Sequence, residues 1–455
     1  MSAVPGPTAV APSQLYWCEL AWLGEETATP GVLLSVSGER IEEVARLDSP
    51  PPGAMRLDGL TLPGLANAHS HAFQRALRGR TQAGRGSFWT WREQMYALAA
   101  SLTPDAYRAL ARATFAEMAL AGITLVGEFH YLHHGRDGVP YDDPNELGNV
   151  ILDAAAAAGV RLTLLDTCYL RGGIDVPLSP AQRRFADPSA AAWCERVDAL
   201  RPSATARVGA AIHSVRAVDP DSASEIAGWA SAREVSLHAH ISEQPAENEQ
   251  CLDAYGATPT AVLAEQGALT SRFTAVHATH MTQDDVALLG ESAACCCICP
   301  TTARDLADGI GDARSLRDAG ASIALGSDSH AVIDPFEETR AIELDERLAS
   351  GERGRHTAVE LLEAATAGGY ACLGWPQGGR LSAGMLADFT TVSLEGVRLA
   401  GTTTPEHAPA AVVFAAGAAD VRHVFVGGRQ IVRDGSHVDI DAPASLRAAI
   451  QTLAS

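Results

Sequence analysis

Eight apolar runs recur through the middle of the chain, and most are followed by stretches in which apolar positions repeat with helical spacing. Near-continuous apolar runs are typical of strands that are buried on both faces of a parallel sheet. Two clear helical stretches are 104–121 and 145–158, and a glycine follows each of them directly. The predicted strands are 61–69, 123–130, 160–169, 206–213, 235–242, 272–280, 293–300 and 321–328.

Eight strands that alternate with helices favour an α/β fold of the (β/α)8 TIM barrel type. An open doubly wound sheet is the alternative, because strand count alone does not establish closure. Near the chain ends, short apolar runs that resemble strands are joined by turns, at 15–47, 378–394, 409–417 and 421–435. Neither end has enough strands to bury a core alone, so together they are predicted to form one small β-sandwich domain. The predicted domains are 1–60 and 379–455 for the two parts of this β-domain and 61–378 for the barrel.

Composition narrows the class of protein. The 455 residues carry a formal net charge of -21, which disfavours nucleic acid or an anionic membrane as a partner. The first dozen residues lack the basic and apolar regions of a signal peptide, and no apolar run is long enough to span a membrane, so we expect a soluble, cytoplasmic protein. Nine cysteines fit a reducing compartment, and the C-x-x-C formed by Cys296 and Cys299 is interpreted as part of a buried strand.

Ionisable residues gather at the ends of the predicted strands. His69 and His71 are two residues apart on the first strand, so their side chains point to the same face. A lone His-x-His is weak support for a metal site, but the C-terminal strand ends of a barrel are where catalytic groups lie. The further candidates there are His238, His240 and Glu243 on the fifth strand, His277 and His280 on the sixth, and Asp328 on the eighth. From the residues alone, the choice of metal ligand between His238 and His240 stays open.

This arrangement resembles the amidohydrolase superfamily, in its deaminase branch. The resemblance includes GRLSAGMLADF, where members of the superfamily return to the β-domain. More closely, HSHAFQRALRGRT, SFWTWREQMY, GEFHYLHH, HSVRAVDP and GSDSH resemble the family of deiminases that act on N-formimino-L-glutamate in one bacterial route of histidine degradation. The resemblance implies hydrolysis of that small molecule to N-formyl-L-glutamate and ammonia, by a homodimer.

The resemblance also implies roles for the strand-end residues. One divalent metal, with Zn²⁺ the expected ion, would be bound by His69, His71, His240 and Asp328. The same ligands accept iron or manganese. Glu243 would protonate the imine nitrogen, Asp328 would accept a proton from the attacking water, and His277 would stabilise the tetrahedral adduct. The competing interpretations are a structural ion pair for Glu243 and a structural hydrogen bond for His277.

A substrate with two carboxylates requires cations, and the planar guanidinium of arginine binds a carboxylate bidentately. The resemblance assigns this role to Arg92 and Arg216, with Gln74, Tyr131 and His213 as hydrogen-bonding neighbours. By physical chemistry alone, Arg75, Arg78 and Arg80 are equally good candidates. The chain departs from the family pattern after the seventh strand, where Ala303 replaces a usual glutamate and Asp305 a usual asparagine. If those positions line the pocket, they affect the choice of substrate.

Two other functions compete with this hypothesis. The first is deamination of an aromatic heterocycle of the guanine or cytosine type on the same scaffold, which Arg92 and Arg216 disfavour because a neutral base needs no pair of cations. The second is a non-catalytic assembly barrel, which the retained metal-ligand pattern and Glu243 disfavour.

Overall fold

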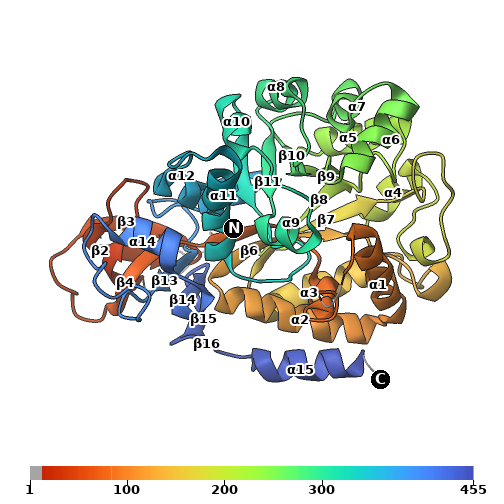
Figure 1. Ribbon diagram of the computed structural model, residues 1–455. Helices are drawn as coiled ribbons and strands as arrows, with labels where there is room; N and C mark the ends of the chain where they lie inside the picture. The colour runs from red at the N-terminus through yellow and green to blue at the C-terminus, as the bar shows by residue number, and fades with distance from the viewer. Residues whose placement is uncertain (1–12, 83–84, 454–455) are drawn as a thin grey trace, which may run out of the picture.

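Two sheets organise the protein (Figure 1). The computed structural model describes residues 13–82 and 85–453, so the first twelve residues, which carry the prediction about a signal peptide, lie outside the described residues. The larger domain holds eight parallel strands whose order in the sheet follows their order in the chain. They are β5 (Leu65–Ser70), β6 (Ile123–His130), β7 (Arg161–Cys168), β8 (Ala206–Ile212), β9 (Leu237–Ile241), β10 (Phe273–His277), β11 (Cys295–Ile298) and β12 (Ser322–Leu325).

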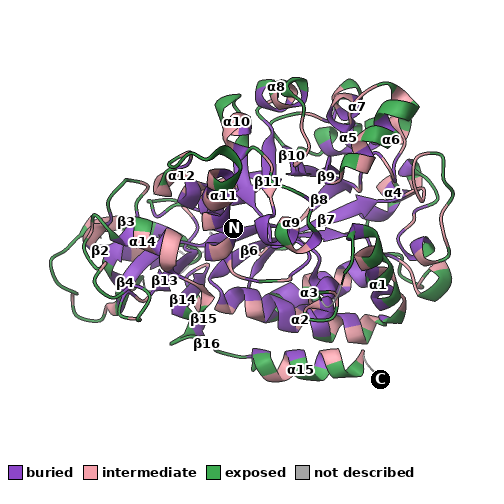
Figure 2. Ribbon diagram, viewed as in Figure 1, coloured by how far each residue is buried: buried purple, intermediate pink, exposed green. Residues whose placement is uncertain are grey.

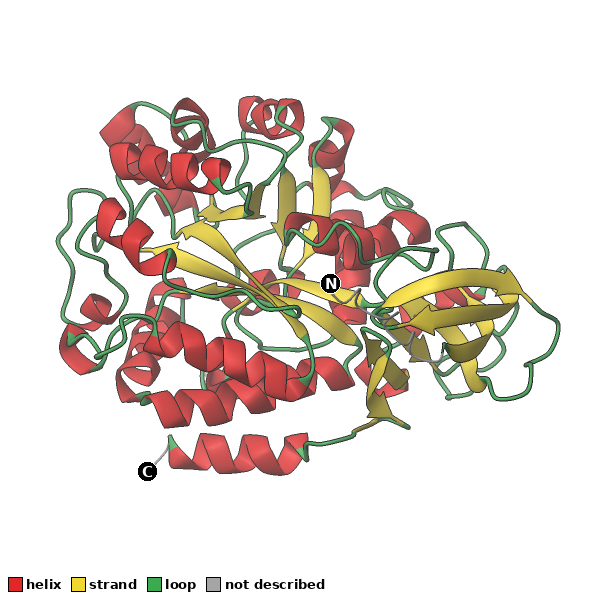
Figure 3. Ribbon diagram, turned by 180° about the vertical axis from the view of Figure 1, so that it is seen from behind, coloured by secondary structure: helices red, strands yellow, loops and turns green. Residues whose placement is uncertain are grey.

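Backbone contacts join the first strand of this sheet to the segment that follows the last. Ser70 and Asp328 form a parallel bridge. The Asp328 N–H donates to the His69 carbonyl oxygen over 3.0 Å, and the His71 N–H donates to the Asp328 carbonyl oxygen over 3.3 Å. The sheet therefore curls into a nearly closed barrel (Figure 3), which confirms the predicted fold class and rules out an open doubly wound sheet.

Helices surround the barrel, with their apolar faces buried against it and their polar faces exposed (Figure 2). The two helical stretches singled out in the sequence are α2 and α3, and Gly122 and Gly159 adopt positive φ beyond their ends. The helices are α1 (Phe88–Ser101), α2 (Pro104–Leu120), α3 (Glu146–Ala158), α4 (Ala190–Val197), α5 (Pro220–Ala232), α6 (Pro245–Tyr255), α7 (Pro259–Glu265), α8 (Gln283–Glu291), α9 (Pro300–Leu306), α10 (Ala313–Asp318), α11 (Pro335–Ser350), α12 (Ala358–Glu363), α13 (Gly369–Cys372), α14 (Ala408–Ala415) and α15 (Ala442–Thr452).

The second sheet draws its strands from both chain ends, which confirms the prediction of one small β-domain built from them. It is a mixed sheet in the order β16-β15-β14-β13-β4-β1-β2-β3. Tyr16, Phe389 and Phe425 pack their rings together in its own apolar core. The predicted domain boundaries stay predictions. The strands are β1 (Gln14–Ala21), β2 (Thr29–Ser37), β3 (Arg40–Arg46), β4 (Met55–Pro63), β13 (Phe389–Val392), β14 (Val421–Val426), β15 (Arg429–Arg433) and β16 (Ser436–His437).

Two predicted strands need correction. The run 61–69 is divided, because 61–63 completes β4 in the small domain and β5 begins only at Leu65. Gly64 makes the passage between the two sheets, where a Cβ would lie 2.1 Å from Thr124 Oγ1. The run 409–417 is largely helix α14 rather than a strand. Its alanines favour the helix, and Val412 and Val413 are buried within the larger core.

Two predictions drawn from composition concern cysteines and membranes. Cys295, Cys296 and Cys297 lie buried in β11, as predicted, but the strand ends at Ile298, and Cys299 is buried just before the first residue of α9. All nine cysteines are free thiols. Among the described residues, no helix is both long enough and apolar enough to cross a membrane.

Candidate metal centre and active site

Side chains from three strands meet at the C-terminal end of the barrel. His69 Nε2 lies 3.1 Å from His240 Nε2 and 3.2 Å from Asp328 Oδ1. His71 Nε2 lies 3.3 Å from the same Asp328 oxygen. All four side chains are buried. The structure therefore brings together the four residues that the sequence predicts as metal ligands.

The protonation of these groups fits a bound cation. Burial lowers the pKa of His69 to about 3 and that of His240 well below its ordinary value, so both imidazoles are neutral. Burial alone would raise the pKa of Asp328, but its contacts with His69 and His71 hold that pKa well below the usual range. His71 Nδ1 lies 2.9 Å from the Phe129 carbonyl oxygen, to which it donates. With Nδ1 engaged there, Nε2 is the ring nitrogen that faces Asp328, and a metal ion between the two would bind both.

The choice between the two histidines of β9 follows from their depth in the barrel. His238 Nε2 is 3.2 Å from the Cys372 carbonyl oxygen, to which it donates, and it takes no part in the four-residue cluster. His240 sits one layer nearer the C-terminal end, where its ring stacks on Phe129 with centroids 4.3 Å apart. Geometry thus favours His240, as the resemblance does.

Glu243 and His277 flank the cluster. His277 Nε2 lies 3.7 Å from Glu243 Oε1, and the His277 ring stacks on that of His240 with centroids 5.3 Å apart. His277 and Asp328 both have positive φ, at 73° and 42°, which costs conformational energy in residues other than glycine. Such local strain is common at functional sites, where the surrounding structure must hold it in place.

These groups open into one cavity. Every predicted site residue except His69, which lies behind the wall, lines it. The lining residues are His71, Gln74, Phe88, Trp91, Arg92, Met95, Tyr96, Tyr131, Tyr169, Phe185, His213, Arg216, His240, Glu243, His277 and Asp328.

The cavity has two arginines in its wall. Arg92, on α1, lies over the Trp89 ring at 4.5 Å, and no carboxylate of the described residues forms an ion pair with it. Arg216 follows β8, and Arg171 fixes the main chain there by donating to the carbonyl oxygens of Val215 and Arg216 over 2.8 Å and 3.2 Å. Arg92 thus has no carboxylate partner among the described residues, and Arg216 faces one, Glu247, only at its Nε atom, over 3.8 Å.

The competing arginines are already engaged. Arg75 and Arg78 each form an ion pair with Glu117 over 2.6 Å, and neither lines the cavity. Arg80 is likewise absent from the cavity wall. The sequence left these three arginines equivalent to Arg92 and Arg216, and the structure separates the two groups.

The remaining predicted residues sit between the arginines and the cluster. Gln74 Nε2 donates to the Tyr131 hydroxyl over 2.9 Å, which leaves the Gln74 Oε1 atom buried without a partner among the described residues. Burial raises the pKa of Tyr131 well above its ordinary value. Burial, and then the charge of Arg216, lowers the pKa of His213, which is therefore neutral.

Sequence reasoning missed several aromatic residues of the wall, among them Tyr96, Tyr169 and Phe185. Tyr169 directly follows β7, so the rule that functional groups follow barrel strands could have identified it.

The two departures from the family pattern lie outside the cavity. Neither Ala303 nor Asp305 lines the cavity, and Asp305 accepts a hydrogen bond from the Gln82 side chain over 2.8 Å.

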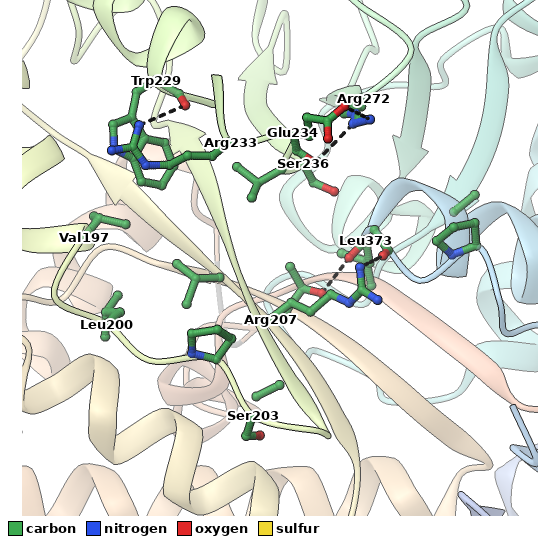
Figure 4. Close-up of a pocket in the computed structure, with 18 of the residues that line it drawn as sticks. Val197, Leu200, Ser203, Arg207, Trp229, Arg233, Glu234, Ser236, Arg272 and Leu373 are labelled. Carbon is green, nitrogen blue, oxygen red and sulfur yellow. Dashed lines mark hydrogen bonds and ion pairs between the residues drawn. The ribbon is translucent and has the colours of Figure 1, made fainter. Parts of the chain in front are cut away.

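A larger cavity of about 740 Å³ lies at the opposite, N-terminal end of the barrel strands (Figure 4). Two of its three arginines are neutralised there, because Arg233 pairs with Asp198 and Arg272 with Glu234. Arg207 instead donates to the Gly374 carbonyl oxygen and lies over the Trp375 ring. Its lining contains no histidine among the described residues, so size alone does not mark it as the reactive site.

The chain belongs to the amidohydrolase family, which it matches over residues 60–431, and is a hydrolase of C–N bonds whose buried histidine and aspartate cluster could hold a metal ion. It is 38% identical to the formimidoylglutamate deiminase of Pseudomonas aeruginosa, over 93% of this chain and 95% of that protein. It is 30% identical to a 5-methylthioadenosine/S-adenosylhomocysteine deaminase of Natronomonas pharaonis, over 86% of this chain and 85% of the relative. The crystal structure of an amidohydrolase from Brucella melitensis superposes with a TM-score of 0.90, at 31% identity, and covers 97% of this chain and 100% of that chain.

Proposed function

We propose that the protein is a zinc-dependent deiminase that hydrolyses N-formimino-L-glutamate to N-formyl-L-glutamate and ammonia. The main support is the presence of two guanidinium groups, Arg92 and Arg216, in the cavity that also holds the histidine and aspartate cluster. A substrate with a carboxylate at each end of a short chain matches that pair of cations. The similarity to the Pseudomonas aeruginosa deiminase supports the same substrate.

The metal would be held by His69, His71, His240 and Asp328. When bound, a divalent ion lowers the pKa of a water ligand to about 7 and polarises the bond under attack. We propose zinc because three imidazoles and one carboxylate are ligand types that it commonly takes. Stoichiometric metal analysis of the purified protein tests this choice against iron and manganese.

Protein side chains would move the protons. Asp328 accepts a proton from the water that attacks the formimino carbon, and Glu243 donates one to the imine nitrogen. The resulting tetrahedral adduct collapses: its hydroxyl proton returns to Glu243 as the formyl C=O forms, the C–N bond breaks, and ammonia leaves with the proton that Asp328 took from water. General acid/base catalysis of this kind contributes about 10²- to 10⁴-fold. His277, whose Nε2 faces Glu243 at 3.7 Å, would stabilise the adduct.

The rest of the cavity would hold the substrate. Arg92 and Arg216 bind the two carboxylates, and Gln74, Tyr131 and His213 hydrogen-bond to the molecule. The unpartnered Gln74 Oε1 atom is a free acceptor for a donor of the substrate. Fixing both ends of the chain places the formimino carbon beside the metal ligands, which is how binding energy at a distance contributes to rate.

Deamination of an aromatic heterocycle is the second candidate. The aromatic wall, which includes Trp91, Tyr96 and Tyr169, offers surfaces for stacking a base, and the Natronomonas pharaonis relative is named for a nucleoside substrate. Arg92 and Arg216 oppose it, because a neutral base leaves Arg92 without a carboxylate partner and supplies no anion to the terminal nitrogens of Arg216.

An ammonia-release assay separates these candidates. We expect metal-loaded protein to release ammonia from N-formimino-L-glutamate and to accumulate N-formyl-L-glutamate in equal amount. Guanine, cytosine and 5-methylthioadenosine, tested in parallel, should give none. Turnover of one of these three compounds with no reaction of N-formimino-L-glutamate would reject the proposal in favour of the second candidate.

The proposed setting is histidine degradation in the reducing cytoplasm, where nine free thiols are stable. We further propose that the enzyme is a homodimer, which light scattering of the purified protein tests directly.

A further inference from the structure

Glu247 lies behind the cavity wall, on the first turn of α6, and is a buried carboxylate that the proposed mechanism does not use. Its side chain is 1% exposed. It does not line the cavity, whereas Arg216, the cation that it faces, does. Burial raises the pKa of Glu247, and the charge of Arg216 opposes that shift.

Two buried polar atoms face each other between these residues. Arg216 Nε lies 3.8 Å from Glu247 Oε1, and neither atom has a hydrogen-bond partner among the described residues. A guanidinium group can bind one carboxylate along its Nε edge and another across its two terminal nitrogens. Because Glu247 faces the Nε atom, the terminal nitrogens are left for an anion in the cavity.

The second oxygen of Glu247 contacts the segment that carries the proposed proton shuttle. Glu247 Oε2 accepts from the Glu243 backbone N–H over 3.4 Å. One buried carboxylate thus lies between the main chain of Glu243 and the side chain of Arg216. A shift of either neighbour moves the other relative to the metal ligands.

We infer that Glu247 is a positioning residue that orients Arg216 toward one carboxylate of the substrate and ties that orientation to Glu243. This inference rests on the proposed function, since it assigns a second role to the same cavity. Without the charge of Glu247, the Arg216 guanidinium is free to turn away from the substrate, and binding of the carboxylate weakens.

The variant Glu247→Gln separates this role from simple capping of α6. Glutamine keeps an oxygen that accepts from the Glu243 N–H but removes the negative charge. We expect kcat/KM for N-formimino-L-glutamate to fall by up to about 10²-fold, mostly through a higher KM, because small misplacements of a binding group cost that much. Metal content should not change.

A double-mutant cycle with Arg216→Met decides whether Glu247 acts through Arg216. In that background, Glu247→Gln should alter kcat/KM by no more than about twofold, which is close to the margin of additivity for independent sites. An equal penalty in both backgrounds overturns the inference. If Glu247→Gln does not fold, Glu247→Asp, which keeps the charge but shortens the reach to Arg216, is measured in the same two backgrounds, and its penalty should likewise disappear with Arg216→Met.

Two shortened substrates sharpen the result, one formimino compound lacking the α-carboxylate and one lacking the γ-carboxylate. The compound whose turnover is indifferent to Arg216→Met should also be indifferent to Glu247→Gln. Sensitivity to one variant without the other contradicts the inference.

Glu343→Gln is the matched control. Glu343 is a fully buried glutamate on α11, paired with Arg347 over 2.7 Å and absent from the cavity wall. Its replacement should alter thermal stability without altering KM. Wild-type protein that releases no ammonia from N-formimino-L-glutamate overturns the proposed function and this inference together. An active wild type whose Glu247 penalty is the same in both backgrounds overturns the inference alone.

Discussion

Two buried histidine and aspartate clusters in this protein have nearly the same ligand spacing but different chemistry. One contains His69, His71, His240 and Asp328 at the end of the barrel; the other contains His130, His133 and Asp166 between β6 and β7. In both, ligand atoms of three residues lie within 4.8 Å of one another. Spacing alone would thus mark two metal sites.

The two clusters differ because the second one contains a cation that the protein itself supplies. In the second cluster, Arg196 pairs with Asp166 and with Asp187, each over 2.8 Å. Its Nη2 atom also lies 3.2 Å from His133 Nε2. The guanidinium thus supplies, at Asp166 and His133, the positive charge that a metal ion would otherwise bring. The first cluster has one ionised carboxylate and no arginine paired with Asp328 among the described residues, so an added cation would complete it.

The largest expected effect comes from breaking the first cluster. His240→Gln should remove bound metal and reduce turnover to background, because one of four ligands is lost. His238→Gln, two residues away on the same strand, should retain metal and serves as the control. Metal analysis by mass spectrometry checks both. Loss of metal from a His133→Gln variant would show that the two clusters are alike and would break the comparison.

The variant Glu243→Gln tests the proposed proton transfer and leaves the four proposed metal ligands unchanged. We expect metal content to stay at the wild-type level while turnover falls by about 10²- to 10⁴-fold, the contribution of a general acid/base. Ammonia release and metal analysis on the same sample give the answer. A variant that remains active shows that the proton shuttle lies elsewhere.

Arg196→Met removes the internal cation of the second cluster. Asp166 and Asp187 are then buried without a partner charge, which should lower the free energy of unfolding by about 3–5 kcal/mol. Denaturation in urea measures the loss. The metal content of the Arg196→Met variant decides between two interpretations. One ion per chain means that the second cluster is purely structural. Two ions per chain mean that Arg196 alone kept a metal ion out of the second cluster.

Measured over a single pH unit, the smallest effect is in the pH dependence of stability. Burial lowers the pKa of His130 and of His133 from 6.5 to about 3. Between those values the unfolded chain binds protons that the folded chain does not, so stability is intact above pH 6.5 and is lost as the pH falls toward 3. Urea unfolding of metal-loaded His133→Gln at several pH values should show a shallower slope than wild type, by up to about 1.4 kcal/mol per pH unit. An unchanged slope contradicts the assignment.

The sequence predicts the repeating strands well because buried parallel strands are nearly continuous apolar runs; β6 has the predicted bounds. It cannot show that the chain leaves one sheet and enters the other at Gly64. The lack of space for a side chain there is due to Thr124, which is distant in the sequence. The engagement of Arg75 and Arg78 likewise depends on Glu117. Periodicity also misassigned 409–417, where the alanine content was the better guide.

The strand-end residues of the candidate site could be predicted from the sequence, but the charged residues that pack around the clusters could not. His69, His71 and Asp328 follow from a rule about strand ends, which needs only the order of the elements. Arg196 reaches the second cluster from α4, and nothing in its local sequence indicates that destination. Glu247 was also missed, because its role depends on a neighbour from a different loop.

The backbone bridge between Ser70 and Asp328 makes the proposed metal ligands part of the seam that closes the barrel. Asn67 strengthens that seam by accepting from the Ser327 N–H and donating to the Ser327 hydroxyl, although the two residues are 260 positions apart in the chain. The ligand set therefore does not exist in a nascent chain until the last barrel strand has emerged and found the first. Since contacts of such long range form late and slowly, metal uptake during refolding should report the final step of assembly. The ion would then bind and stabilise completed barrels but not partly folded ones, which lack the full ligand set.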